Sequence, residues 1–267
     1  MAGNFQYTGA PALACLAALR AGVDVVTCAS PRRAAGITAT FSPSIITYPL
    51  EGDFLMEKHL AILFNLAQKK DAVALGPGLG REEETFEVVR KLVARVDVPV
   101  IVDADGIYAF AQSQKYNPKF KSGKIIFTPH IRELEVLYGR KISDESLESK
   151  TKIARETAQK LGAIVLLKGP TDIITDGAEV VLNKTGSPYM TSGGTGDVLA
   201  GIAGALAAQL HVRGERDYFK AATCAAYLSG RAGEMAAKKY KDSLVATDVI
   251  EKISTVIKKT SDNHSRA

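Results

Sequence analysis

The sequence predicts a three-layer α/β fold in which helices cover both faces of a mainly parallel central sheet. Two observations carry this prediction. Helix-like and strand-like segments alternate along the 267 residues, as in repeated βαβ units. The strand-like segments are continuous apolar runs, which is typical of strands buried on both faces of a parallel sheet. We therefore expect one domain over residues 1–260, followed by a disordered polar tail over 261–267.

Local sequence signals predict where the helices and strands begin and end. The first is an alanine-rich helix over 12–21, with Thr8 as its N-cap, Pro11 in its first turn and Gly22 closing its end. The other expected helices cover 54–70, 81–96, 147–161, 197–210, 217–240 and 246–259. The expected strands cover 23–29, 71–75, 98–102, 124–127 and 163–167, followed by a hairpin over 172–182 that turns at Asp176-Gly177.

Composition limits the classes of function. The net charge is only +5, with no long basic run and no Trp, so we expect no nucleic-acid partner and favour an anionic small molecule. Apolar runs are too short for a membrane span, and no basic leader precedes the first of them, so we expect a cytoplasmic protein without membrane partners. The three cysteines have no metal-type spacing and are expected to be buried thiols.

The most informative segment is the glycine-rich run at 192–197, which leads into a helix of small residues. Gly193, Gly194, Thr195 and Gly196 form a loop with little side-chain bulk, and free N–H groups of the following helix would face a bound oxyanion. Asp197 stands at the helix start, where a general base could act on a hydroxyl close to a phosphate. An N-cap aspartate after a flexible loop explains the same pattern equally well.

Other chemically useful residues also follow predicted strands, and ligands of parallel sheets bind at the carboxyl ends of the strands. The glycine turn at 76–80 could let a ligand approach its backbone, or it could be an ordinary tight turn. Asp103 is interpreted as a turn residue. Asp105 could help to hold Mg²⁺ with ligand phosphates, or cap the helix that starts at Gly106.

The ends of two further predicted strands and the start of the first helix also carry residues that could bind a ligand. His130 could bind a substrate group or move a proton, with Glu133 one helical turn away. Lys168 could neutralise a nucleotide phosphate and Thr171 could add a hydroxyl, although a solvated turn gives the same pattern. The amides of Gly9 and Ala10 could hold a second anion. Two anion sites, an acid and a lysine turn together predict phosphoryl transfer to a hydroxyl with Asp197 as the base.

Taken in order, these segments resemble the ADP- or ATP-dependent NAD(P)H-hydrate dehydratases, which belong to the ribokinase-like superfamily. The matching motifs are Gly-Asn and Tyr-Thr-Gly-Ala-Pro, then Gly-Pro-Gly-Leu-Gly, Val-Asp-Ala-Asp-Gly, Thr-Pro-His, Leu-Leu-Lys-Gly, Gly-Gly-Thr-Gly-Asp-Val-Leu-Ala-Gly and Ala-Thr-Asp-Val-Ile. The resemblance implies a ribokinase-like fold. It also implies a reaction in which ADP or ATP, with Mg²⁺, phosphorylates the ring hydroxyl of (6S)-NADHX or NADPHX and the phosphate is then eliminated.

The resemblance also implies site residues. Its hydrate-binding residues fall on Ala10, Gly80, His130 and Asp197, and its nucleotide-binding residues fall on Lys168, Gly169, Pro170, Thr171, Asp172 and Gly196. Asp197 would be the base, and the glycine loop would hold the transferred phosphoryl group. The implied partners are the hydrated cofactor and an adenine nucleotide, and we expect a homo-oligomer.

Some positions depart from the family pattern. Family members carry a strand before Gly-Asn, whereas this chain begins at Met1-Ala2, so we expect the sheet to lack an edge strand or the chain to be a shortened form. Arg132, Tyr108 and the segment 187–190 also differ, which affects fine substrate contacts. Two other functions compete: a small-molecule kinase of the same superfamily, such as a hydroxyethylthiazole or sugar kinase, and a non-catalytic nucleotide-binding protein.

Overall fold

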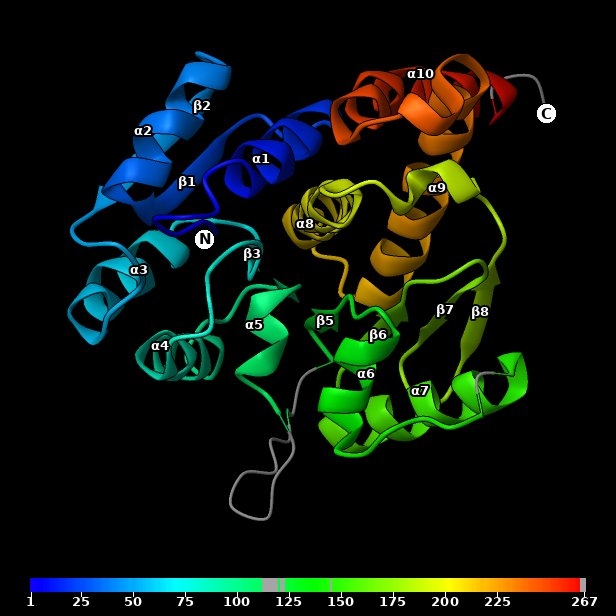
Figure 1. Cartoon of the computed structure of the whole chain (residues 1–267), viewed down its shortest axis with the longest axis horizontal. Helices are drawn as coiled ribbons and strands as arrows, with labels where there is room; N and C mark the ends of the chain where they lie inside the picture. The colour runs from blue at the N-terminus through cyan, green and yellow to red at the C-terminus, as the bar shows by residue number, and fades with distance from the viewer. Residues whose placement is uncertain (112–119, 121–122, 145, 265–267) are drawn as a thin grey trace.

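The computed structural model describes residues 1–111, 120, 123–144 and 146–264. In this part of the chain the strands form two sheets (Figure 1). A two-stranded parallel sheet pairs β1 with β2, and a six-stranded sheet has the order β3-β4-β5-β6-β7-β8. The strands are β1 (Val26–Pro31), β2 (Ile45–Leu50), β3 (Val73–Leu75), β4 (Val100–Val102), β5 (Ile125–Phe127), β6 (Ile164–Leu167), β7 (Asp172–Thr175) and β8 (Val180–Asn183).

The larger sheet is mainly parallel. Strands β3 to β6 pair in parallel, and β7 and β8 add an antiparallel hairpin at one edge. The turn of that hairpin contains Gly177 at φ +97°, and Asp176 Oδ1 accepts the N–H groups of Ala178 and Glu179 at 2.8 Å. The mainly parallel sheet and the hairpin over 172–182 are therefore confirmed.

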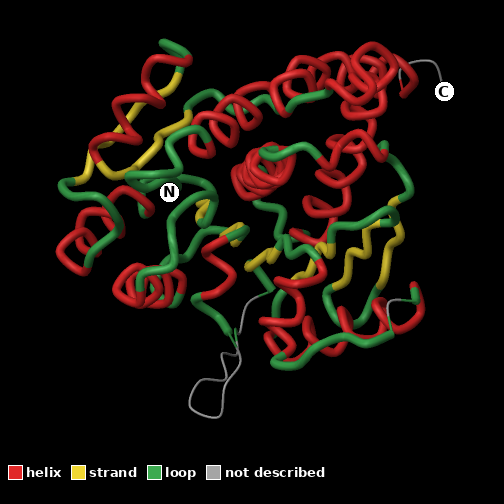
Figure 2. Tube along the Cα trace, in the orientation of Figure 1, coloured by secondary structure: helices red, strands yellow, loops and turns green. Residues whose placement is uncertain are grey.

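Helices cover both faces of the sheet, as Figures 1 and 2 show. They are α1 (Ala10–Arg20), α2 (Arg32–Phe41), α3 (Leu60–Ala67), α4 (Glu83–Val93), α5 (Asp105–Tyr108), α6 (Ile131–Tyr138), α7 (Leu147–Leu161), α8 (Thr195–Val212), α9 (Tyr218–Tyr240) and α10 (Ala246–His264). Short 3-10 turns lie at Glu57–His59, Pro188–Thr191 and Lys241–Ser243. Because helices flank the sheet on both sides, the three-layer prediction is confirmed.

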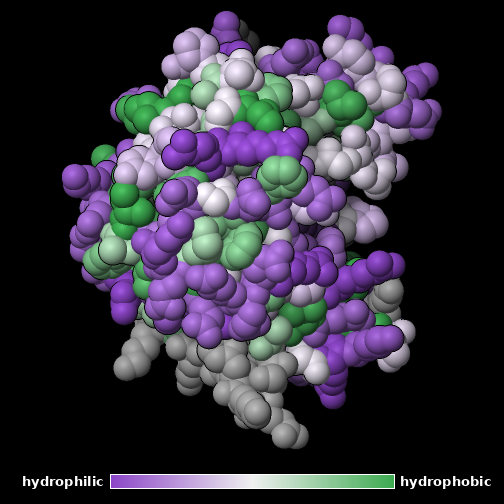
Figure 3. All heavy atoms as spheres, turned by 60° about the vertical axis from the view of Figure 1, so that its left-hand side comes forward, coloured by the Kyte–Doolittle hydropathy of each residue, from purple (hydrophilic) through white to green (hydrophobic). Residues whose placement is uncertain are grey.

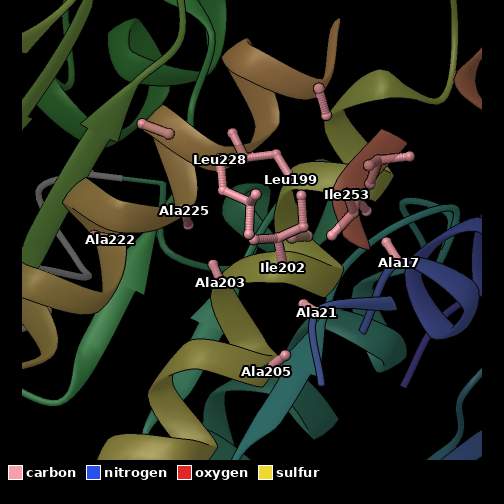
Figure 4. Packing of buried hydrophobic residues seen from close by; sticks show 14 of the residues in the cluster. Ala17, Ala21, Leu199, Ile202, Ala203, Ala205, Ala222, Ala225, Leu228 and Ile253 are labelled. Carbon is pink, nitrogen blue, oxygen red and sulfur yellow. The ribbon is translucent and has the colours of Figure 1, made fainter. Parts of the chain in front are cut away.

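The side chains on the two faces of the larger sheet pack into separate hydrophobic cores, because successive side chains of a strand point to opposite faces. On β4, Ile101 packs with α1, α8, α9 and α10, whereas Val100 and Val102 pack with α3, α4 and α5. Figure 4 shows how the first core is built: Leu199 and Ile202 of α8 meet Leu228 of α9 and Ile253 of α10. Small residues let α1 approach α8 closely, since a Cβ on Gly201 would lie 2.2 Å from the carbonyl oxygen of Ala14.

The start of the chain lies beside β3. The Met1 ammonium donates to the carbonyl of Ala74 at 2.6 Å, and the Met1 carbonyl accepts from the Gly76 N–H at 3.2 Å. This is the pairing pattern of a parallel ladder opposite Leu75. The larger sheet begins at β3, and the first residues of the chain lie beside that strand.

Several element predictions need correction. The segments Arg32–Phe41 and Ile45–Leu50 form α2 and β2, which the sequence did not predict, and β1 starts three residues later than expected. Thr8 does not cap α1, because Gly9 is the N-cap and no side chain caps that end. Of the cysteines, Cys15 and Cys28 are buried as expected, but Cys224 is exposed on α9. Helix α10 continues to His264, into the segment expected to be a disordered tail, and 265–267 lie outside the described residues.

Two observations describe how apolar residues are distributed in the described part of the chain. None of the described helices combines the length and the apolar character needed to cross a membrane. On the face seen in Figure 3, polar side chains predominate and apolar ones gather in separate patches.

Candidate functional site

The glycine-rich loop runs directly into α8, as expected. Gly194 is the N-cap of α8 with φ +93°, so Thr195, Gly196 and Asp197 form its first turn, where N–H groups lack helical partners. The alternative interpretation of Asp197 as the N-cap is therefore wrong. The Thr195 hydroxyl donates to the carbonyls of Met190 and Ser192 at 2.8 and 3.0 Å, and this fixes the loop to the turn before it.

Gly194 is required for two reasons. Its φ is one that L side chains rarely adopt, and an added Cβ would lie 2.5 Å from Leu13 Cδ1. We expect Gly194→Ala to lower the free energy of unfolding by about 1–2 kcal/mol from the backbone alone. Gly193→Ala is the matched control, because nothing lies within 4 Å of its added Cβ. Urea unfolding of both variants checks this, and an equal loss of unfolding free energy in the two variants would contradict it.

A buried ion pair lies against this loop. Lys168, at the end of β6, places Nζ 2.8 Å from Oδ1 of Asp103, which follows β4 and is 1% exposed. The Thr128 hydroxyl, at the end of β5, donates to the same oxygen at 2.8 Å. A Cβ on Gly196 would lie 3.4 Å from Lys168 Nζ, so the ammonium group abuts the first turn of α8. Three neighbouring strand ends therefore supply one charged cluster beside the loop.

Glu133 and His130 extend this cluster. The His130 N–H donates to Glu133 Oε2 at 2.8 Å, and His130 Nδ1 accepts from the Glu133 N–H at 3.1 Å, so the two residues form a capping box at the start of α6. Glu133 Oε2 also lies 3.8 Å from Lys168 Nζ. Burial raises the pKa of the Glu133 carboxyl, and Lys168 opposes that rise. His130 thus has a structural role that links it to Lys168 through Glu133.

Burial, and after it the neighbouring charges, raise the pKa of the Asp197 carboxyl. Burial raises the pKa of its carboxyl to about 7; Asp103 and Asp105 add to the rise, and Lys168 opposes it. For Lys168, burial lowers the pKa, but Asp103 and Glu133 outweigh burial and the net shift is upward. At neutral pH the cluster therefore holds a firmly charged ammonium beside a carboxyl that can both take up and release a proton.

A cleft of about 480 Å³ brings together three of the expected substrate residues: Ala10, Gly80 and Asp197. Asn4 and Tyr7 complete one wall, and Asn4 Oδ1 accepts the N–H groups of Gln6 and Tyr7 at 2.8 and 2.7 Å. Gly80 has φ +81°, and an added Cβ would lie 2.6 Å from Asn4 Nδ2. Neither His130 nor any residue of 168–172 is among the described residues that line this cleft.

Asp105 also lines the cleft, but its oxygens are already engaged. Oδ2 accepts the Gly80 N–H at 3.1 Å, and Oδ1 pairs with Arg81 Nε at 3.1 Å. The guanidinium of Arg81 in turn stacks on the ring of Tyr108, 3.8 Å from its centroid. The alternative of an Asp105 N-cap is wrong, since Ala104 holds that position with φ 49° and without a side-chain cap. Among the described residues, no group of three or more His, Cys, Asp or Glu side chains could hold a metal ion.

The turn at 168–172 is held by its own last residue. Asp172 Oδ1 accepts the Gly169 N–H at 3.0 Å, and Oδ2 accepts from Asn183 Nδ2 at 2.9 Å. Pro170 and Gly169 are exposed, and Thr171 is half-buried. Lys168 therefore lies on the inner side of this turn against the glycine loop, and its neighbours present an exposed backbone.

Sequence reasoning missed several residues of this site. Asp103 was interpreted as a turn residue, although it is the buried partner of Lys168. The sequence predicted Asn4 only as part of the Gly-Asn motif, and it did not predict Arg81 as a site residue. An unpaired acid after an apolar strand is the one signal that could have identified Asp103, because a buried carboxylate needs a partner.

A search with family models matches residues 1–255 to the model described as NAD(P)H-hydrate dehydratase. A bifunctional NAD(P)H-hydrate repair enzyme of Pyrobaculum aerophilum is 42% identical over 259 residues, which are 96% of this chain and 49% of that protein. An ADP-dependent (S)-NAD(P)H-hydrate dehydratase of Nitrosopumilus maritimus is 33% identical over 96% of this chain and 86% of its own. The chain thus spans about half the length of the bifunctional relatives.

Solved structures agree with these relatives. An ADP/ATP-dependent NAD(P)H-hydrate dehydratase of Bacillus subtilis, co-crystallized with ATP/Mg²⁺ and soaked with CoA, superposes with a TM-score of 0.78. It shares 25% identity, with 97% of this chain and 89% of that one covered. A hydroxyethylthiazole kinase of Pyrococcus horikoshii has a TM-score of 0.60 at 17% identity, over 91% of this chain and 92% of its own, and so shares the fold alone. The ribokinase-like fold is therefore confirmed.

Proposed function

This chain belongs to the NAD(P)H-hydrate dehydratase family, and from that premise we propose that it converts (6S)-NAD(P)HX to NAD(P)H at the expense of ADP or ATP. The observation that carries the proposal is the position of Asp197. Its carboxyl, with a pKa of about 7, lines a 480 Å³ cleft with Ala10 and Gly80, and it lies in the helix turn that follows a glycine-rich loop. The proposed base thus lines the cleft, and the proposed anion site is the loop that directly precedes it in the chain.

The proposed reaction has two stages. Asp197 removes the proton from the ring hydroxyl, and that oxygen attacks the terminal phosphoryl group of the nucleotide, so ADP leaves as AMP or ATP leaves as ADP. The ring carbon–oxygen bond then breaks, phosphate leaves with the bonding electrons, and loss of a proton from the neighbouring carbon restores the double bond. The first-turn N–H groups of α8 would hold the transferred group, and Lys168 would offset its charge.

The nucleotide would lie between the glycine loop and the turn at 168–172. Lys168 supports this placement, because its ammonium touches the first turn of α8 while its backbone leads into the exposed turn. We propose Lys168, Gly169, Pro170, Thr171, Asp172 and Gly196 as the nucleotide-binding residues and Ala10, Gly80, His130 and Asp197 as the hydrate-binding residues. His130 would reach the substrate from outside the cleft, through its exposed side chain.

The described carboxylates do not fit a resident metal site. Asp103 is committed to Lys168 and Thr128, and Asp105 to Gly80 and Arg81. Mg²⁺ prefers one or two carboxylates together with phosphate oxygens, so we propose that it arrives with the nucleotide and is held mainly by the phosphates. A cytoplasmic location and a homo-oligomeric state remain part of the proposal.

Product analysis separates this function from a kinase. With hydrated cofactor and ADP, ³¹P NMR should show AMP and inorganic phosphate appearing in equal amounts, together with reduced nicotinamide. A phosphorylated product that persists would favour a small-molecule kinase instead. Nucleotide binding without any new phosphorus signal would favour a non-catalytic binding protein.

A further inference from the structure

An arginine that takes no part in the proposed chemistry lies at the cleft of Asp197. Arg81 is the one basic residue among the described residues that line this cleft. The acidic residues of the lining are Glu82, Asp105 and Asp197. The side chain of Arg81 is 60% exposed, whereas that of its partner Asp105 is 16% exposed, so the guanidinium lies at the mouth of the cleft. The single cation of an otherwise acidic lining thus stands where a ligand enters.

Two neighbours hold the guanidinium of Arg81 in place. Asp105 Oδ1 pairs with Nε at 3.1 Å, and the ring of Tyr108 stacks against the guanidinium carbon, which lies 3.8 Å from the ring centroid. Asp105 Oδ2 also accepts the Gly80 N–H at 3.1 Å, so one carboxylate fixes two successive residues of the turn. Binding ordinarily costs an exposed arginine much of its side-chain freedom, and these contacts remove part of that freedom beforehand. Tyr108 is one of the positions that depart from the family pattern, and the stack gives this departure a structural role.

The guanidinium fork fits a phosphate group. Nε is one of five N–H donors of an arginine, and the four donors on Nη1 and Nη2 can bind two oxygens of one phosphate side by side. The substrate proposed above carries its reacting hydroxyl on the nicotinamide ring, which is followed by a ribose and then by a pyrophosphate. With the ring at Asp197, the pyrophosphate is the first anionic group towards the mouth of the cleft. Without a cation there, its charge would face three carboxyl groups.

We propose that Arg81, held by Asp105 and Tyr108, binds the pyrophosphate of the hydrated dinucleotide and so sets the affinity for this substrate. The inference rests on the proposed function, since it takes the hydrated cofactor as the ligand of the cleft. Arg81 has no part in the transfer of the proton or of the phosphoryl group, so it acts on KM and not on kcat. The 2′-phosphate of NADPHX is on the far ribose, and NADHX and NADPHX therefore depend on Arg81 equally.

Kinetics and binding together test this assignment. Arg81→Gln should raise KM for NADHX and for NADPHX by roughly 10–100-fold, the worth of a hydrogen bond to a charged group, with kcat and the KM of the nucleotide unchanged. Titrations with NADH and with NADPH, in excess AMP to fill the proposed nucleotide site, should show the same loss of affinity without turnover. Arg95→Gln, which changes an exposed arginine outside the cleft lining, is the matched control and should behave as the parent does.

Variants of the two holding residues separate direct binding from an effect on Asp105. Tyr108→Leu should weaken NADH binding roughly two- to five-fold, and this loss should vanish in the Arg81→Gln background. Tyr108→Phe keeps the ring and should recover the affinity of the parent. If Arg81→Gln combined with Asp105→Asn restores full affinity, the proposal is overturned, because Arg81 would then act only by neutralising that carboxyl.

The outcomes distinguish this proposal from the proposed function. If the parent turns over NADHX and Arg81→Gln binds NADH equally well, the assignment of Arg81 is overturned and the dehydratase activity stands. A loss confined to NADPHX and NADPH overturns the pyrophosphate assignment in favour of the 2′-phosphate. A parent protein that binds ADP but neither binds NADH nor turns over NADHX overturns the proposed function, and this inference with it.

Discussion

Asp197→Asn should lower kcat/KM by roughly 10²–10⁴-fold, the usual contribution of a general base, and leave nucleotide affinity unchanged. The amide keeps the shape of the side chain but cannot accept the hydroxyl proton. Steady-state kinetics and nucleotide titration on the same preparation check this. Asp97→Asn is the matched control, because that side chain is exposed and does not line the cleft. A loss of nucleotide affinity equal to the loss of rate would contradict the assignment of Asp197 as the base.

The raised pKa of Asp197 also predicts a pH dependence. The carboxylate is the active form, so kcat/KM should rise with pH through about 7 and level off above it. Stability should change in the opposite sense. Because the pKa is higher in the folded state than in the unfolded chain, charging Asp197 destabilises the fold, fully above pH 7 and not at all below the unfolded pKa. Asp197→Asn should therefore be more stable than the parent at pH 8, and this advantage should vanish as the pH falls towards 4.

Lys168→Met should have the largest effect on stability among changes at the site. It leaves Asp103 buried, 1% exposed, with the Thr128 hydroxyl but no cation. Breaking one side of such a pair costs about 3 kcal/mol of unfolding free energy, here at the lower end because the lysine side chain is 22% exposed. Nucleotide binding should be lost as well, since the phosphates lose their cation.

A double variant separates these two losses. Asp103→Asn combined with Lys168→Met removes both charges, so urea unfolding should show that much of the lost stability returns while nucleotide affinity does not. Lys160→Met, on the exposed side of α7, is the control for loss of a positive charge. Full recovery of nucleotide binding in the double variant would show that Lys168 acts only on Asp103 and not on the nucleotide.

The parts of the fold that carry strong local signals were predictable. α7 has Ser146 as a side-chain cap, helical apolar spacing and Gly162 after its end, and its predicted bounds agree with the structure. α2 and β2 were not, because Arg32–Phe41 contains a central glycine and β-branched residues, and Ile45–Leu50 carries a proline. Their structure depends on packing against each other and against β1, which no local window contains.

The same difference between local signals and long-range contacts applies to the residues of the site. The glycine loop and Asp197 are contiguous in sequence, so their chemistry could be inferred from a single segment. The partnership of Asp103 with Lys168 joins residues 65 positions apart, and the capping box ties His130 to a buried Glu133 that touches the same lysine. These roles depend on the order of strands β4, β5 and β6 in the sheet, which brings their carboxyl ends together.

The most direct test follows the absorbance of the reduced nicotinamide ring while the protein is mixed with NADHX, Mg²⁺ and either ADP or ATP, with Asp197→Asn in parallel. Our account predicts that absorbance returns only when a nucleotide is present, and that the variant shows no return although it binds the nucleotide. No return with either nucleotide, from folded parent protein that binds them, would contradict the proposed dehydratase. An unchanged rate in Asp197→Asn would contradict the central role of this carboxyl.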